Sequence, residues 1–407
     1  MTDAGEVTAS GRAAPDGVLA VVTGEMYQAG IVGTGSYDES MTRERLLAWR
    51  LANQHLAGTR TEDPAQLVAH FGAVQAQEYG QSLWAIGLRT TQATVGTIEA
   101  AVERGAILRT WPMRGTIHFV PAGDARWLVE LLAGRRIRQM TGVYRKIGLT
   151  DEVLCRSGEI VAGALRGGHR VRRKDMYSLL TGHGVDCSAS PHGSRGGHIL
   201  GYLSMTGLIC LGPLDGRQQT FVLLDEWAPD ARTPADPMAE LAARYFTSHG
   251  PATVRDFGWW SGLNLAEVRE AIERAGPALA ATELDGKTYW HGSGQNPGAV
   301  PGGVYLLPAF DEYTVAYSDR AALLNGRPFP HGDLLNPVMV LDGLAVGLWK
   351  RSLGGGAATI QLAPFGTIST RDRERFWQAA ERYAEFLGLP ATITQASADQ
   401  VRRQRWQ

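Results

Sequence analysis

The chain has 407 residues, of which 44% are hydrophobic and 20% are charged, and its formal net charge is −1. This composition is typical of a soluble globular protein, excludes a disordered one, and gives enough length for two or three modules. No apolar run approaches the roughly 18 residues of a transmembrane helix, and the three cysteines form no C-x-x-C pair. We therefore expect a cytoplasmic protein with no membrane partner, no cofactor and no metal.

The near-zero net charge conceals a basic segment. Residues 104–195 contain 16 Lys and Arg against 7 Asp and Glu, whereas the rest of the chain contains 24 against 34. Such an excess can form a basic face for a polyanion, or it can be a set of solvated arginines on helix faces. Composition alone leaves both interpretations open.

The N-terminal 40 residues are rich in glycine and have no basic start before an apolar core. They do not fit a signal peptide, and we expect a disordered extension or a mis-assigned start. The following pattern predicts three helices and two short strands, a winged-helix arrangement over residues 41–150. The expected helices span Thr42–Leu56, Asp63–Phe71 and Thr94–Arg104, and the strands span Ile107–Thr110 and Thr116–Val120.

The same pattern recurs twice, which predicts an α+β protein built of tandem winged-helix modules. The second module, residues 151–235, has expected helices Val171–Leu180 and Gly197–Met205 and a hairpin Leu208–Leu211 with Thr220–Leu224. The third, residues 236–300, has expected helices Met238–Ser248, Thr253–Trp260 and Leu265–Ala275 and a hairpin within Ala281–Trp290. Residues 301–407 predict a β-rich C-terminal portion with strands Val304–Pro308, Val338–Leu341, Leu344–Lys350 and Thr359–Ala363 and a last helix Arg371–Leu387.

Two glutamines, Gln75 and Gln77, stand two residues apart between an apolar helix and an aromatic-rich segment. In an extended segment this spacing places both amides on one side and turns Ala76 away. An amide both donates and accepts hydrogen bonds and does not titrate, so the pair can hold one water at any physiological pH. A polar helix end is the alternative that the spacing alone does not exclude.

Several motifs occur together and in order: Gln75-Ala-Gln77, Arg109-Thr-Trp-Pro-Met-Arg-Gly-Thr116, His249-Gly-Pro251 before Trp259-Trp260-Ser-Gly262, Leu306-Leu-Pro-Ala-Phe-Asp-Glu-Tyr313, and Gly343 to Trp349. With them the sequence resembles the AlkZ/YcaQ family of bacterial winged-helix DNA glycosylases, over about residues 41–390. Glutamine at both motif positions makes it similar to the AlkZ branch, associated with self-resistance to DNA-alkylating natural products.

The resemblance implies a monofunctional DNA glycosylase that removes N7-alkylguanine or bulky, crosslinked purines from double-stranded DNA, acting as a monomer. It implies that Gln75 and Gln77 are catalytic and that Asp311 and Glu312 support them. Glu78 adjoins the pair and is a weaker candidate for a general base, because the alternation turns it to the other face. Only four lysines occur, none near the glutamines, which favours water over an amine nucleophile.

Contacts to DNA are expected from basic side chains that bind phosphates and read no sequence. The candidates are Arg109, Arg114, Arg135, Arg136, Arg138, Arg172, Arg173 and Arg195, with Trp111 as a possible base-stacking residue. The alternative function is a noncatalytic winged-helix transcriptional regulator, since the fold alone does not give the activity.

Overall fold

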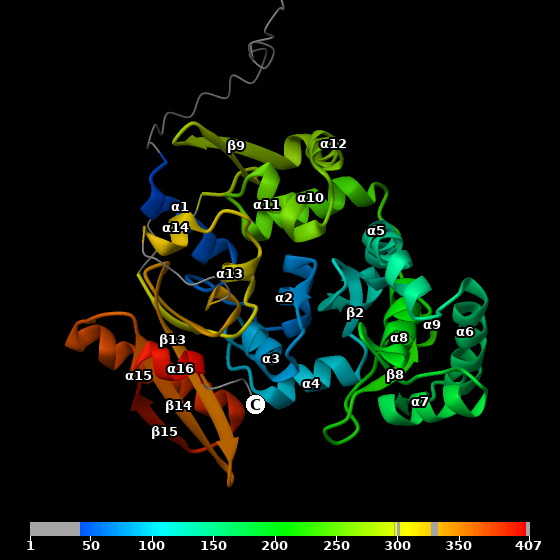
Figure 1. Ribbon diagram of the computed structural model, residues 1–407. Coiled ribbons are helices and arrows are strands. Elements are labelled where there is room, and N and C mark those ends of the chain that lie inside the picture. Colours follow the sequence, from blue (N-terminus) through cyan, green and yellow to red (C-terminus); the bar gives the residue numbers. More distant parts are fainter. Residues whose placement is uncertain (1–40, 297, 299–301, 327–332, 404–407) are drawn as a thin grey trace, which may run out of the picture. The chain divides into compact units, whose positions relative to one another are not determined.

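The computed structural model describes residues 41–296, 298, 302–326 and 333–403 (Figure 1). The predicted N-terminal extension lies outside the described residues. Helices and strands alternate along the described part, which confirms the predicted α+β class. Within it, no helix is both long enough and apolar enough to cross a membrane.

The N-terminal region forms close to the predicted boundaries. Thr42 caps the first helix by accepting from Arg45 N, and Asp63 caps the second, which Pro64 begins. Both caps satisfy amide groups that have no partner inside the helix. The elements are α1 (Arg43–Asn53), α2 (Pro64–Phe71), β1 (Val74–Gln75), α3 (Tyr79–Gly87), α4 (Val95–Glu103), β2 (Ile107–Met113) and β3 (Thr116–Pro121).

Two long helices follow that the sequence pattern did not predict, α5 (Ala125–Lys146) and α6 (Asp151–Leu165). Most of the buried side chains of α5 lie in its first half, Ala125–Ala133, and its second half carries a cluster of arginines. The helical spacing of its apolar residues is therefore interrupted, which is why the pattern did not predict α5. The helix packs on β2 and on α8 (Arg195–Met205).

The hairpins of the first two predicted modules join in one six-stranded antiparallel sheet, in the order β1-β3-β2-β7-β8-β4. The junction is the pairing of Arg109 in β2 with Leu211 in β7. Residues 171–172 pair with β8, so the helix predicted from Val171 begins two residues later. The remaining elements here are β4 (Val171–Arg172), α7 (Arg173–Gly182), β5 (Ala189–Ser190), β6 (Gly193–Ser194), β7 (Ile209–Leu211), β8 (Thr220–Leu223) and α9 (Leu224–Trp227).

The third region contains the elements expected from its pattern. Figure 1 shows α10 (Pro237–His249), α11 (Val254–Ser261) and α12 (Leu265–Ala275) grouped beside β9 (Leu279–Leu284). Capping boxes at Thr253 and Asn264 start α11 and α12, and β9 pairs with β10 (Lys287–Gly292) around Asp285 and Gly286. The assignment of these helix–hairpin units as winged helices remains a prediction.

The C-terminal portion is a five-stranded sheet in the order β11-β12-β13-β14-β15, which confirms the predicted β-rich character. The fifth strand was not predicted; it pairs parallel to β14 after the long helix α15 returns the chain. The elements are β11 (Val304–Leu307), α13 (Glu312–Val315), α14 (Ala321–Leu324), β12 (Val338–Leu341), β13 (Leu344–Gly354), β14 (Ala357–Pro364), α15 (Thr370–Leu387), β15 (Ala391–Gln395) and α16 (Ala398–Arg403).

This sheet packs against the N-terminal helices and brings residues 306–309 to α3, the helix that follows Gln75 and Gln77. The Trp84 indole donates to the Leu306 carbonyl at 2.7 Å, and the Ala309 amide donates to Gln81 Oε1 at 3.3 Å. We expect the apolar turn Leu306 to Phe310 to be buried; Leu306 to Ala309 are, whereas Phe310 is half-buried. Residues from both regions belong to one hydrophobic cluster, so the C-terminal sheet and the N-terminal helices share a core.

Candidate active site

Gln75 ends the two-residue strand β1, at the edge of the six-stranded sheet. It pairs with His118 in β3, and the next amide, Ala76 N, donates to the Ile117 carbonyl at 2.8 Å. Gln75 and Ala76 are buried, whereas Gln77 is exposed. The extended conformation expected for this segment is therefore present at Gln75, but the two glutamines differ in their exposure to solvent.

The two amide side chains also differ in their bonding. Gln77 Oε1 accepts a hydrogen bond from Ile117 N at 3.3 Å. Among the residues that the structure describes, none hydrogen-bonds the side-chain amide of Gln75. The residue is 9% exposed and its amide atoms are not among the buried atoms that lack a partner, so this group is open to a water or a substrate atom.

Glu312 holds the backbone of Gln75. The carboxylate is buried at the start of α13, where its Oε1 accepts from Gln75 N at 2.8 Å. Its Oε2 accepts from Trp260 Nε1 at 3.0 Å and lies 3.3 Å from His249 Nε2. The structure thus places Glu312 directly against the backbone of the candidate catalytic residue.

Burial of the Glu312 carboxyl raises its pKa, but the hydrogen bond and charge of His249 oppose that effect. Smaller contributions from His118 and the Gln75 amide act in the same direction as His249, and together they lower the pKa of Glu312. We therefore expect Glu312 to be ionised at neutral pH.

Asp311 stands beside Glu312 in sequence but faces another partner. Its two oxygens accept from the Arg89 guanidinium at 2.7 and 2.8 Å, and Oδ1 also accepts from Tyr313 N at 2.9 Å. Both members of the ion pair are buried. Asp311 therefore fixes the first turn of α13 and supports Gln75 only through Glu312.

His118 lies across the strand pair from Gln75 and is fully buried. Burial, assisted by the nearby Arg114 charge, lowers the pKa of His118 to about 4. Arg114 Nη2 lies 3.3 Å from His118 Nε2 and can only donate, so the ring proton is on Nδ1 and points to the Thr116 carbonyl. His118 is thus neutral at neutral pH and has both nitrogens engaged.

Arg109 is buried and Arg114 is half-buried, so neither lies on the open surface expected of phosphate contacts. Arg114 has φ +55° in the turn between β2 and β3 and folds back onto His118. Arg109 is buried, lies 4.4 Å from the Tyr79 ring centroid, and donates to the Ala76 carbonyl and to Gln219. Burial lowers the pKa of Arg109 to about 10. Arg109 therefore supports the glutamine segment from behind.

The remaining candidates are Trp111 on β2, the weaker general-base candidate Glu78, and six arginines on α5 and in the second module. Trp111 is half-buried against Val129, Ala133 and Met205, and Glu78 is exposed where α3 begins. Arg138 and Arg173 are exposed, and Arg136 lies against Gly115 of the β2–β3 turn. The other three arginines form ion pairs: Arg135 with Glu267, Arg172 with Asp215, and Arg195 with Asp186.

Sequence reasoning missed His118, His249 and Trp260 as parts of the site. The last two stand in the quoted motifs, but nothing local shows that they meet Glu312, which lies 63 and 52 residues away. For His118, the signal available was its place on a strand next to the predicted wing turn.

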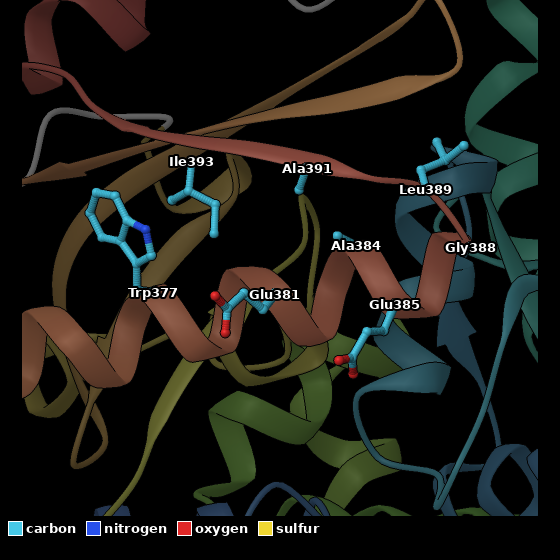
Figure 2. A pocket seen from close by; sticks show the side chains of 8 residues that line it. All are labelled: Trp377, Glu381, Ala384, Glu385, Gly388, Leu389, Ala391 and Ile393. Atoms are coloured by element: carbon cyan, nitrogen blue, oxygen red, sulfur yellow. The ribbon is translucent and has the colours of Figure 1, made fainter.

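An open groove of about 490 Å³ lies elsewhere, between α15 and β15. Figure 2 shows Trp377, Glu381 and Glu385 on the helix, with Ala391 and Ile393 on the strand. None of its lining residues belongs to the cluster around Gln75, so it has no part in the candidate site.

We expect the protein to lose stability in mild acid, because two of its histidines have lowered pKa values. Burial lowers the pKa of both His70 and His118 from 6.5 to about 4. Above pH 6.5 both are neutral in the folded and unfolded states; below it the unfolded chain binds protons that the folded chain does not. The free energy of unfolding should therefore fall by about 1.4 kcal/mol per histidine per pH unit as pH drops from about 6.5 toward 4.

Urea denaturation between pH 7 and pH 5 tests this, since most carboxyl groups titrate below that window. His118→Gln should remove part of the slope, whereas the same change at the exposed His192 should leave it intact. A free energy of unfolding that is unchanged from pH 7 to pH 5 would contradict the prediction.

Comparisons with known proteins identify the family of the chain. The model of a family described as DNA glycosylase AlkZ-like matches residues 68–386. The interstrand DNA cross-link repair glycosylase of Streptomyces sahachiroi is 24% identical over 327 residues, covering 75% of this chain and 87% of that protein. The solved structure of Streptomyces sahachiroi DNA glycosylase AlkZ has the same fold, with a TM-score of 0.69 and 22% identity over 87% of this chain and 100% of that chain. The chain therefore belongs to the AlkZ-like family of DNA glycosylases.

Proposed function

We propose that this DNA glycosylase is monofunctional and hydrolyses the N-glycosidic bond of N7-alkylguanine and of bulky or crosslinked purines in double-stranded DNA. The observation that carries the proposal is the buried Gln75, whose backbone is held by Glu312 while its amide remains unbonded among the described residues. The repair of interstrand crosslinks named for the Streptomyces sahachiroi relative supports the bulky substrates. We extend the proposal to self-resistance against a DNA-alkylating metabolite.

The chemistry of the leaving group explains how a site with two neutral amides can suffice. Guanine alkylated at N7 carries a positive charge and leaves the deoxyribose as a neutral base, so it needs little protonation. Charge then develops on the sugar, where amide oxygens from Gln75 and Gln77 can stabilise it and align a water for attack. A general base with a tuned pKa is less important here than for a poor leaving group.

DNA binding is assigned to the exposed basic side chains rather than to the buried ones. Arg138 on α5 and Arg173 at the start of α7 are exposed, and Arg136 lies beside the β2–β3 turn that carries the site. We propose that these arginines contact phosphates, with Arg135, Arg172 and Arg195 exchanging their present partners for DNA. Such contacts bind the duplex without selecting its sequence.

Incubation of the full chain with duplexes carrying one N7-methylguanine or one bulky N7 adduct tests the function. Alkaline cleavage at abasic sites should appear at the lesion, and borohydride should trap no covalent protein–DNA adduct, because water is the nucleophile. A trapped adduct would contradict the monofunctional assignment. Intact DNA together with a symmetric, sequence-dependent footprint would instead support the noncatalytic regulator, which family membership no longer favours.

A further inference from the structure

We infer that Glu312, His249 and Trp260 form a positioning relay whose task is to fix the backbone of Gln75, an inference that rests on the proposed function. The three side chains come from α13, α10 and α11, and all are buried. Because all three are buried, they do not reach a bound substrate directly and act on the reaction only through Gln75. They are therefore positioning residues rather than catalytic ones.

The relay follows from the place of Gln75 in the sheet. Because β1 is an edge strand and Ala76 N points to β3, Gln75 N points away from the sheet and has no neighbouring strand to bond. A buried amide without a partner is costly, and Glu312 Oε1 supplies the acceptor at 2.8 Å. The Glu312 carboxylate thus replaces the missing neighbouring strand as the acceptor for the backbone amide of Gln75, one of the two residues proposed to act in the chemistry.

The second carboxylate oxygen keeps the first one in place. Trp260 Nε1 donates to Oε2 at 3.0 Å, and His249 Nε2 lies 3.3 Å from the same oxygen. Since an ionised carboxylate only accepts, His249 Nε2 must carry the proton. The imidazole ring is itself held by stacking on Tyr245 at 4.8 Å and by the edge of Phe71 at 5.2 Å.

Other charged and titratable groups also face the carboxylate, so a change at Glu312 has to be separated from a change in their charge. His118 from β3 and Arg114 from the β2–β3 turn lie close enough to affect or be affected by its charge, as does Tyr245 of α10. A test on rate alone would not distinguish positioning from this electrostatic influence. Two combined variants do so.

The first test is whether Glu312 acts through Gln75. Glu312→Gln should slow single-turnover excision of N7-methylguanine by about 10- to 100-fold, with the Kd for the lesion duplex unchanged, because it misplaces one reacting group. In the Gln75→Ala background the same substitution should change the rate by less than about twofold, since residues that act as a unit are not additive. Equal losses in both backgrounds would overturn the inference.

The second test separates the hydrogen bond from the charge. A glutamine side chain at position 312 has one oxygen acceptor and one NH₂ donor. In the single variant Glu312→Gln, with Trp260 still present, the NH₂ group must therefore face another donor, either Gln75 N–H or Trp260 N–H. Trp260→Phe removes one of these donors. In Trp260→Phe/Glu312→Gln the amide oxygen can then accept from Gln75 N while the NH₂ faces His249, whose proton moves to Nδ1 and points to Ser248 Oγ at 2.8 Å.

The double variant should recover to within about threefold of Trp260→Phe alone if the bond to Gln75 is what matters. A double variant as slow as Glu312→Gln would show that the charge is required and would overturn the positioning role. Asp256→Asn is the matched control: its carboxylate is buried and multiply bonded to Thr253 and Ser318, but it does not touch Gln75. It should lower the Tm while the excision rate of the folded protein stays at the parent value. If the parent itself leaves no abasic sites, the proposed function fails instead.

Discussion

Replacing Gln75 by alanine should slow the excision of N7-methylguanine from duplex DNA by about 100-fold, the typical cost of one positioned hydrogen-bonding group. The affinity for the lesion duplex should remain nearly intact, because phosphate contacts by arginines provide most of the binding. The side-chain amide of Gln75 has no hydrogen-bond partner among the described residues and keeps access to solvent, so its loss removes no internal hydrogen bond. Single-turnover kinetics and a separate measurement of Kd distinguish the two effects.

Gln77→Ala should also slow excision, and the double variant should lose less than the product of the single losses, because the two amides hold one water. Glutamate at either position is a sharper probe, since it keeps the acceptor and removes the amide donors. Neither glutamine titrates, so the parent rate should stay flat between about pH 6 and pH 8, where a histidine base would produce a step. Gln378→Ala, on the exposed face of α15, is the control. If both site variants excise at the parent rate, the pair is only a structural strand end.

The elements that the sequence predicted well are those with local signals. The third region is an example: Thr253 and Asn264 cap the helices, and Asp285-Gly286 turns the hairpin, so each boundary has its own chemistry. Helix α5 lacks such regularity, because Gly134 and the following arginines interrupt its apolar face. Strand β15 is largely exposed and short, and only its parallel pairing to β14 identifies it.

Sequence motifs identified individual residues of the candidate site, whereas the structure shows which of them are in contact. Gln75 was identified by its neighbours in sequence, and Glu312 by a motif in the same chain. Their contact joins residues 237 apart, and the bonds of Glu312 to His249 and Trp260 depend on how three helices pack. The sequence also did not show which side chains are buried. Arg109 was expected on the surface as a phosphate contact, but it is buried and donates to the carbonyl of Ala76. Sequence patterns report chemistry, whereas exposure and partners are set by tertiary packing.

Asp311→Ala should destabilise the protein by about 3–5 kcal/mol, the usual cost of leaving one member of a buried ion pair alone. The side chains of Arg89 and Asp311 are 3% and 0% exposed, and they meet in a two-pronged contact of 2.7 and 2.8 Å. Arg89 also donates to the carbonyls of Gln54 and Ala85, so the guanidinium cannot turn to solvent without breaking these bonds. An uncompensated cation would therefore stay in the core of the variant.

Urea denaturation at pH 7 measures this loss, and Glu270→Ala is the control. Its partner Arg274 is on the same helix, and their side chains are 52% and 47% exposed, so removing that pair should cost less than about 1 kcal/mol. Replacing both buried partners, as in Arg89→Met/Asp311→Leu, should recover part of the stability, because no charge is then left unpaired. The double variant should nevertheless excise N7-methylguanine more slowly than the parent, because it lacks the Asp311 carboxylate that caps the helix turn carrying Glu312. A loss for Asp311→Ala no larger than that for Glu270→Ala would show that water reaches Arg89, and that α13 is not anchored by this pair.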